Sequence, residues 1–198
     1  MTDRDLSEPP LSPAEAHRRM PSLALIDDDR LRAETRRLTR FAPAYFWERA
    51  GSTAGYHNGH EHGLWAHTLK LSTVIERLAD SFVERGRLRE ADVDRAHAAA
   101  ILHDQRKAGE DGERTLSDHD LRMGAVVREE SPVEDDAVAR AIEEHMGPWY
   151  DGPDPSSELA ELVHVADMIA SDDAIAVAVP APRPRELEAF VDEVVLDG

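Results

Sequence analysis

Five predicted helices carry a histidine or an aspartate on the face where their apolar residues gather. This departure from the usual pattern constrains the fold more than any other feature. The residues are His67, His103, His119, His145 and Asp167. A single histidine on an apolar face is usually a hydrogen-bonded core residue. Several buried imidazoles and carboxylates, however, are costly unless something shared compensates them. A divalent cation between helices that face one axis is such a compensator.

The apolar periodicity of the rest of the chain predicts an all-α protein, a single-domain bundle of about seven to nine helices. Gly-, Asp- and Pro-rich joints separate the helical segments. After a short helix from Ala14, the expected helices cover about 30–40, 44–50, 64–82, 90–103, 117–129, 134–146, 157–171 and 185–195. Residues 175–180 alternate as a short extended segment would.

The 198 residues suffice for one domain with its own core. Residues 1–13 contain three prolines among polar and acidic residues, so we expect a flexible leader there and the helical domain over 14–198. No run approaches the roughly 20 apolar residues of a membrane span, and the N-terminus lacks the pattern of a secretory signal. We therefore expect a cytoplasmic protein without a membrane partner. The oligomeric state does not follow from the sequence.

The charge balance is strongly acidic, with 23 basic against 41 acidic residues and a net charge of −18. Such a surface repels a polynucleotide at low salt. An acidic, Lys-poor, Ala-rich composition is also typical of halophilic proteins, and molar salt screens the repulsion. We interpret the charge as a sign of a halophilic habitat, not as a sign of function.

The chain contains no cysteine. Thiol catalysis and thiolate ligands are thereby excluded, and any metal must be bound through nitrogen and oxygen. Imidazole and carboxylate ligands suit Mn, Fe, Ni, Co, Mg or Zn. The sequence therefore predicts one or two divalent ions in the bundle.

Taken in order, the polar residues on apolar faces, with Asp104 added, give the pattern H…HD…H…H…D. This pattern resembles the HD superfamily of metal-dependent phosphohydrolases over about residues 41–172. His67 lies in GLWAHTLKL, His103 and Asp104 form the doublet in AAAILHDQRK, Lys107 holds the HDxxK position, and Asp167 lies in LVHVADMIAS. The resemblance implies a helical hydrolase of phosphoesters.

Two further stretches, YHNGHEHGLWAHT and EEHMGPWYDGP, resemble archaeal and phage HD proteins and the HD domain of bacterial 3′–5′ exoribonucleases. Those exonucleases carry an additional nucleic-acid-binding domain of the OB type, for which this chain has neither room nor strand pattern. Arg106 replaces the glycine common in HDxGK forms, His145-Met146 stands where binuclear HD-GYP proteins have paired histidines, and no GYP motif occurs. These departures weaken the case for a second metal. They weaken the case for cyclic-dinucleotide hydrolysis even more.

The resemblance implies four ligands for a first metal: His67, His103, Asp104 and Asp167. The metal would act as a Lewis acid on a phosphoryl oxygen and acidify the attacking water. His119 and His145 are candidates for a second metal, with Asp104 as the bridge between the two ions. Asp120 competes with His119 for this role, but the helical phase favours His119.

Other residues are expected to meet the substrate. Lys107 is placed to contact a phosphate as a point charge, and Arg106 could do so bidentately or could be a solvated cation at a helix end. His57, in the Gly- and His-rich loop before the first metal helix, could contact substrate or donate a proton to the leaving alkoxide. His60 and His62 share this loop, as substrate contacts or as exposed loop residues. Two tryptophans either stack on a base or belong to the core: Trp65 and Trp149.

The sequence thus predicts a phosphohydrolase that acts on a phosphorylated small molecule, in particular a phosphoester or phosphoanhydride of a nucleotide. Two alternatives of different class stay open. One is a 3′–5′ nuclease acting on single-stranded RNA or DNA, for which nucleic acid would be the substrate. The other is a non-catalytic regulator that binds a nucleotide with the help of a metal.

Overall fold

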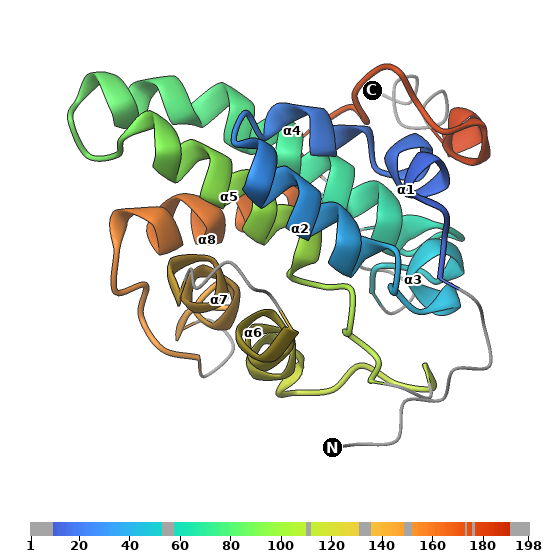
Figure 1. Ribbon diagram of the computed structural model, residues 1–198. Coiled ribbons are helices and arrows are strands. Elements are labelled where there is room, and N and C mark those ends of the chain that lie inside the picture. The colour runs from blue at the N-terminus through green and yellow to red at the C-terminus, as the bar shows by residue number, and fades with distance from the viewer. Residues whose placement is uncertain are drawn as a thin grey trace.

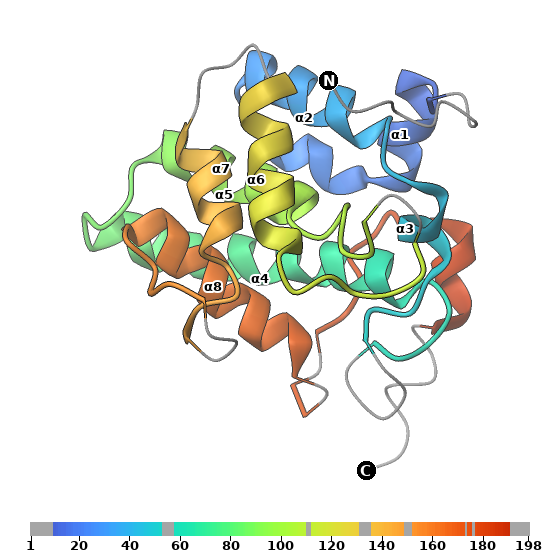
Figure 2. The same cartoon turned by 90° about the horizontal axis from the view of Figure 1, so that it is seen from below.

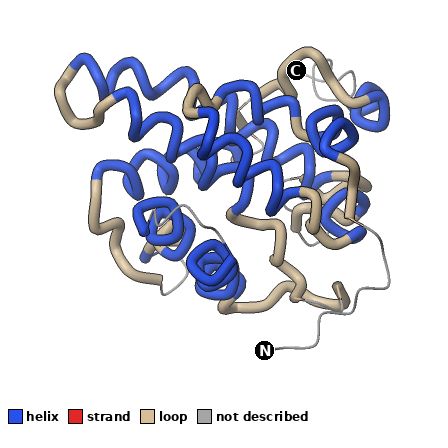
Figure 3. The backbone as a smooth tube through the Cα atoms, in the orientation of Figure 1, coloured by secondary structure: helices blue, strands red, loops and turns tan. Residues whose placement is uncertain are grey.

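The computed structural model describes residues 10–52, 58–109, 112–130, 136–148, 152–172, 174–175 and 177–190. Within these ranges the chain forms eight α-helices. No segment of the described chain is a strand, and Figure 3 shows only helices and loops there, so the predicted all-α bundle is confirmed. The α-helices are α1 (Pro13–Arg19), α2 (Asp29–Thr39), α3 (Ala44–Glu48), α4 (Gly63–Glu84), α5 (Glu90–Leu102), α6 (His119–Glu130), α7 (Asp136–Glu143) and α8 (Glu158–Ser171). Two 3-10 helices accompany them, η1 (Pro21–Leu25) and η3 (Arg185–Phe190).

Helices α4 and α5 form the centre of the bundle (Figure 1). Helix α4 packs against α5 and α8, and α5 also contacts α2 and α7. Helices α6 and α7 form an adjacent pair, which crosses the direction of α4 and α8 (Figure 2). The centre therefore brings together segments from both halves of the chain.

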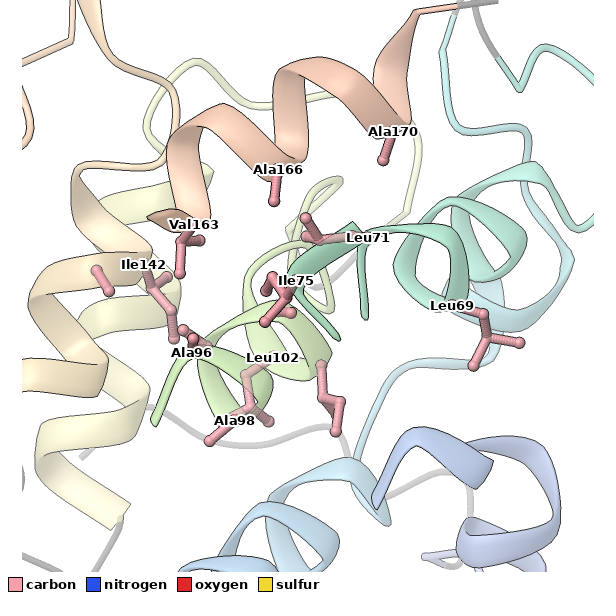
Figure 4. Packing of buried hydrophobic residues seen from close by; sticks show 14 of the residues in the cluster. Leu69, Leu71, Ile75, Ala96, Ala98, Leu102, Ile142, Val163, Ala166 and Ala170 are labelled. Atoms are coloured by element: carbon pink, nitrogen blue, oxygen red, sulfur yellow. The ribbon is translucent and has the colours of Figure 1, made fainter. Parts of the chain in front are cut away.

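Small side chains allow this close packing. Ala96, Ala98, Ala99 and Ala100 of α5 are completely buried, each with 0% exposure. In Figure 4, Ala166 and Ala170 of α8 point toward the α4 side of the core, where Leu71 and Ile75 lie, and Val163 lies beside Ile142 of α7. An alanine-rich, aromatic-poor sequence can fill such a core because short side chains let helix backbones approach one another.

The start of α4 is fixed by a close backbone contact. A Cβ atom built on Gly63 would lie 1.9 Å from the Asn58 carbonyl oxygen, so only glycine fits there. The same carbonyl accepts a hydrogen bond from the Gly51 amide at 2.8 Å. The Asn58 amide oxygen accepts a 2.8 Å bond from Lys70 of α4. The loop therefore sets the position at which α4 begins.

Most predicted helices lie within a few residues of their observed bounds, and Gly86, with a φ of +68°, follows α4. The last one differs. A helix was expected over 185–195, but the structure forms the 3-10 helix η3, and residues 191–198 lie outside the described ranges. Residues 177–180, within the segment expected to be extended, form no strand. In the expected leader, the Leu11 amide bonds to the Arg40 carbonyl oxygen at 3.0 Å.

None of the helices in the described ranges combines the length and the apolar character needed to cross a membrane.

Candidate metal centre

The histidines and aspartates predicted to lie on apolar helix faces come together in the interior of the bundle. His67 lies on α4, His119 opens α6, and Asp167 lies on α8. His103 and Asp104 follow the end of α5 directly, and a further candidate, His145, comes shortly after the end of α7. The buried cluster is thus built by residues on, or shortly after, five separate helices.

The first part of the cluster joins α4, α5 and α8. The His67 Nε2 atom lies 2.9 Å from Asp167 Oδ1. His103 Nε2 lies 3.4 Å from Asp104 Oδ2 and 3.8 Å from Asp167 Oδ1. The four residues expected to bind a first metal are therefore neighbours.

The second part of the cluster shares Asp104 with the first. His119 Nε2 lies 3.2 Å from Asp104 Oδ1, and the ring centroids of His119 and His145 are 5.5 Å apart. Two sets of donor atoms can each hold an ion, because within each set every atom lies within 4.8 Å of the others. One set is His67, His103 and Asp104, and the other is Asp104, His119 and His145.

Three of the imidazoles are oriented by the same backbone contact. The Nδ1 atoms of His103, His119 and His145 lie 2.7, 2.8 and 2.6 Å from the carbonyl oxygen three residues earlier. A carbonyl oxygen only accepts, so Nδ1 carries the proton in each hydrogen bond. In the neutral ring Nε2 then keeps its lone pair, as a metal ligand requires.

The donor set fits a divalent cation. His103 Nε2, His119 Nε2 and Asp104 Oδ1 are buried, and none of them has a hydrogen-bond partner within the described part of the chain. Buried polar atoms without partners are costly. A cation ligated by these atoms would remove that cost, and the nitrogen and oxygen donors match the metals expected from a chain without cysteine.

Electrostatics within the cluster depends on its carboxylates. Burial alone would raise the pKa of Asp104, but Lys107 and His103 together hold it well below its usual range. Burial alone would lower the pKa of His103, yet the nearby Asp104 carboxylate raises it. The pKa of Asp167 is also lowered against the effect of burial, mainly by its bond to His67. Both carboxylates therefore stay ionised.

His145 behaves differently from His103. Its ring is 1% exposed, and burial lowers its pKa to about 3. The imidazole is neutral at ordinary pH and can act as a ligand without losing a proton. His164 accounts for part of its placement, because His164 Nδ1 lies 2.7 Å from the His145 carbonyl oxygen.

Lys107 lies inside the cluster, against Asp104. Its Nζ atom is 2.6 Å from Asp104 Oδ2. Lys107 is expected to meet a substrate phosphate, and the structure adds this direct ion pair. Because α5 ends at Leu102, Lys107 lies in the turns that follow this helix.

The cluster lines a cavity of about 740 Å³. His67, Asp104, His119, His145 and Asp167 all contribute to its wall, as does Lys107. Gly51 and Ser52, from the loop that precedes α4, line it as well. The volume lies within the range of small-molecule sites.

The other residues expected to meet the substrate do not line the cavity or lie outside the described residues. Arg106 points toward the Phe41 carbonyl oxygen, 3.4 Å away, and does not line the cavity. This placement does not support a substrate contact by Arg106, because the chain leaves α5 and turns, directing residues 106 and 107 to different sides. His60 and His62 contact backbone carbonyls, of Glu61 and Trp47 respectively. His57 lies outside the described residues.

Of the two tryptophans considered as stacking platforms, the structure describes Trp65 alone. Trp65 is 1% exposed and donates a 2.8 Å hydrogen bond to the Arg19 carbonyl oxygen, so it is a core residue and no platform for a base. Trp149 lies outside the described ranges.

Asp120, the residue that competes with His119 in the sequence, also lies at the cavity. Asp120 is 6% exposed, lines the cavity, and has a buried Oδ1 without a hydrogen-bond partner in the described chain. His119 belongs to a donor set, so the two residues share the site and need not be alternatives.

Two apolar residues, Leu121 and Met168, also line the cavity. Sequence reasoning missed them because an apolar residue on an amphipathic helix is ordinarily assigned to the core.

A comparison with known families agrees with this geometry. Residues 64–172 match the HD domain family, a range that ends where the sequence resemblance ended and begins at the start of α4. No curated protein and no solved structure matches the chain. The match covers more than half of the chain and includes all six histidines and aspartates of the two donor sets and Asp167. The chain therefore belongs to the HD superfamily of metal-dependent phosphohydrolases.

Proposed function

We propose that this protein hydrolyses a phosphoester or phosphoanhydride of a nucleotide or related small molecule. The observation that supports this most is Asp104, a buried carboxylate common to two donor sets on the wall of one cavity. A shared carboxylate is what a two-metal hydrolase uses to hold both ions. His67, His103, Asp104 and Asp167 would hold the first ion, and His119 and His145 the second.

When bound, the metal supplies Lewis-acid polarisation of a phosphoryl oxygen and a water molecule acidified toward neutral pH. The chain's own residues do the rest. Carbonyl contacts fix the ring positions of His103, His119 and His145. Lys107, with 19% of its side chain exposed, can turn from Asp104 toward a substrate phosphate as a point charge. His57 is proposed as a proton donor to the leaving group, on the basis of the sequence alone.

A metal-reconstitution experiment tests the proposal. The protein is stripped with a chelator and reloaded with Mn, Ni, Co or Mg at low and high salt. Phosphate release is then measured with nucleotides, cyclic nucleotides and short oligonucleotides. We expect no hydrolysis without metal, recovery with at least one divalent ion, and up to two ions per chain by metal analysis. Full activity in excess chelator would contradict the proposal.

A further inference from the structure

Large apolar side chains are exposed at three positions of the described chain, and two of them line the cavity. Leu121 on α6 is 54% exposed, and Met168 on α8 is 37% exposed. The third, Ile175, is 43% exposed and is not among the lining residues. Exposed apolar groups beside a polar site are typical of ligand contacts.

These two side chains lie next to candidate metal ligands in the sequence. Leu121 comes two residues after His119, and Met168 follows Asp167 directly. They come from different helices, so the cavity has an apolar group on each of two walls near the metal cluster. A ligand whose phosphate reaches the cluster would place the atoms beyond the phosphate near these groups.

Apart from bound metal, the side chains that line the cavity offer very little positive charge. Lys107 is the sole Lys or Arg among the described residues that line it. Asp120 and Asp172 add two carboxylates beyond the candidate ligands. The internal segments outside the described ranges contain neither Lys nor Arg, so they add no lysine or arginine charge. A triphosphate or a polynucleotide is held through several cationic contacts, which this wall does not provide.

We propose that the preferred substrate is a phosphate monoester with a single phosphoryl group and a flat apolar leaving group, held between Leu121 and Met168. This inference rests on the proposed function and narrows it. Hydrolysis breaks the bond between phosphorus and the leaving oxygen. The water oxygen bonds to phosphorus, and the leaving oxygen takes a proton, which yields inorganic phosphate and a free hydroxyl compound.

Binding of two phosphonates to the Mn-loaded protein tests the apolar contact without any leaving-group chemistry. Phenylphosphonate carries a flat ring and methylphosphonate does not, while both present the same anionic head. By calorimetry we expect phenylphosphonate to bind about tenfold more tightly or better, from about 50 Å² or more of buried apolar surface. Equal affinities would overturn the proposal.

Three matched substitutions locate the contact. Leu121→Ser and Met168→Ser should each weaken phenylphosphonate binding by about five- to tenfold and methylphosphonate binding much less. Ile175→Ser, at an apolar residue outside the lining whose exposure lies between those of the two cavity residues, should leave both affinities as they are. Circular dichroism checks that the variants fold, which their surface positions favour. Equal weakening of both ligands in the two cavity variants would contradict the assignment.

Kinetics with the parent protein tests the charge argument and separates the two proposals. At low salt, kcat/KM should fall from nucleoside monophosphates to di- and triphosphates, and oligonucleotides should be the poorest substrates. Phenyl phosphate and nucleoside monophosphates as separate arms distinguish a simple aryl group from a base carried on a sugar. Faster hydrolysis of triphosphates or oligonucleotides would overturn the inference alone. No hydrolysis of any ester, together with no phosphonate binding, would contradict the proposed function itself.

Discussion

His97 and His103 are two buried imidazoles on or next to one helix, six residues apart, and they behave in opposite ways. Both are buried, with 3% and 0% exposure. Burial lowers the pKa of His97 to about 4, whereas the Asp104 carboxylate raises the pKa of His103 against the effect of burial. Burial by itself thus lowers the pKa of a histidine, and the close Asp104 carboxylate raises the pKa of His103.

The difference lies in how the neighbouring aspartates are used. Asp94 and Asp27 raise the pKa of His97 only in part. The two oxygens of Asp94 already accept hydrogen bonds from the Asp27 and Asp28 amides, at 2.8 and 3.0 Å. Asp104 Oδ1, by contrast, has no hydrogen-bond partner in the described chain. Asp94 serves the packing of α5 against the start of α2, and Asp104 is left available for a cation.

The largest expected effect is that of removing Asp104. Asp104→Ala takes away the carboxylate shared by both donor sets, so kcat/KM should fall by about 10³-fold or more, with less metal bound per chain. His97→Gln changes a histidine that is equally buried, and it should retain both activity and metal. Metal analysis and phosphate release on the two variants measure this contrast. An active, metal-loaded Asp104→Ala protein would remove the distinction between the two regions.

Lys107→Ala should have an intermediate effect. Loss of a positive charge that meets the substrate phosphate should lower kcat/KM by about 10²-fold. Because Lys107 Nζ lies 2.6 Å from Asp104 Oδ2, its removal also takes away a cation that competes for the carboxylate. The variant should therefore bind divalent metal at least as tightly as the parent, as titration calorimetry can measure. Weaker metal binding would show that Lys107 positions Asp104 for its ligand role.

The smallest effect is expected in the pH dependence of stability at His97. Its pKa is about 4 in the folded protein and 6.5 without perturbation, so the unfolded chain binds more protons between these values. Stability from this group is present above about pH 6.5 and is lost as the pH falls toward 4. The loss at pH 5 should be about 2 kcal/mol.

His97→Gln should remove this contribution. Urea unfolding at pH 7 and pH 5 gives, for the parent and for the variant, the change in the free energy of unfolding between the two pH values. Acid effects on the candidate metal cluster are common to both proteins and cancel in the comparison. Identical pH dependence in the two proteins would mean that burial does not lower the pKa of His97 in the folded protein.

Helical periodicity predicted the all-α fold and the inward direction of the cluster residues that lie on helices, whereas His103, Asp104 and His145 follow helix ends. In a helix, positions three, four and seven residues apart share a face, so His67 and Asp167 had to point where their apolar neighbours point. The directions of Lys107 and Arg106 could not be predicted. Both follow the end of α5, where the backbone turns are not set by a periodic pattern and long side chains have many rotamers. The cavity contacts of Leu121 and Met168 depend on the relative positions of α6 and α8, which no local pattern encodes.

The close approach at Gly63 has a consequence for the cluster far larger than one missing methyl group suggests. An α-helix is stiff along its axis, and His67 lies four residues after Gly63, about 6 Å further along. Any side chain at position 63 would collide with the Asn58 carbonyl oxygen, 1.9 Å from the added Cβ, so either the loop backbone at Asn58 or α4 itself must shift, and we expect α4 to move as a unit. His67 Nε2 would then leave its place 2.9 Å from Asp167. A residue that touches neither metal nor substrate thereby sets the distance between two candidate ligands on different helices.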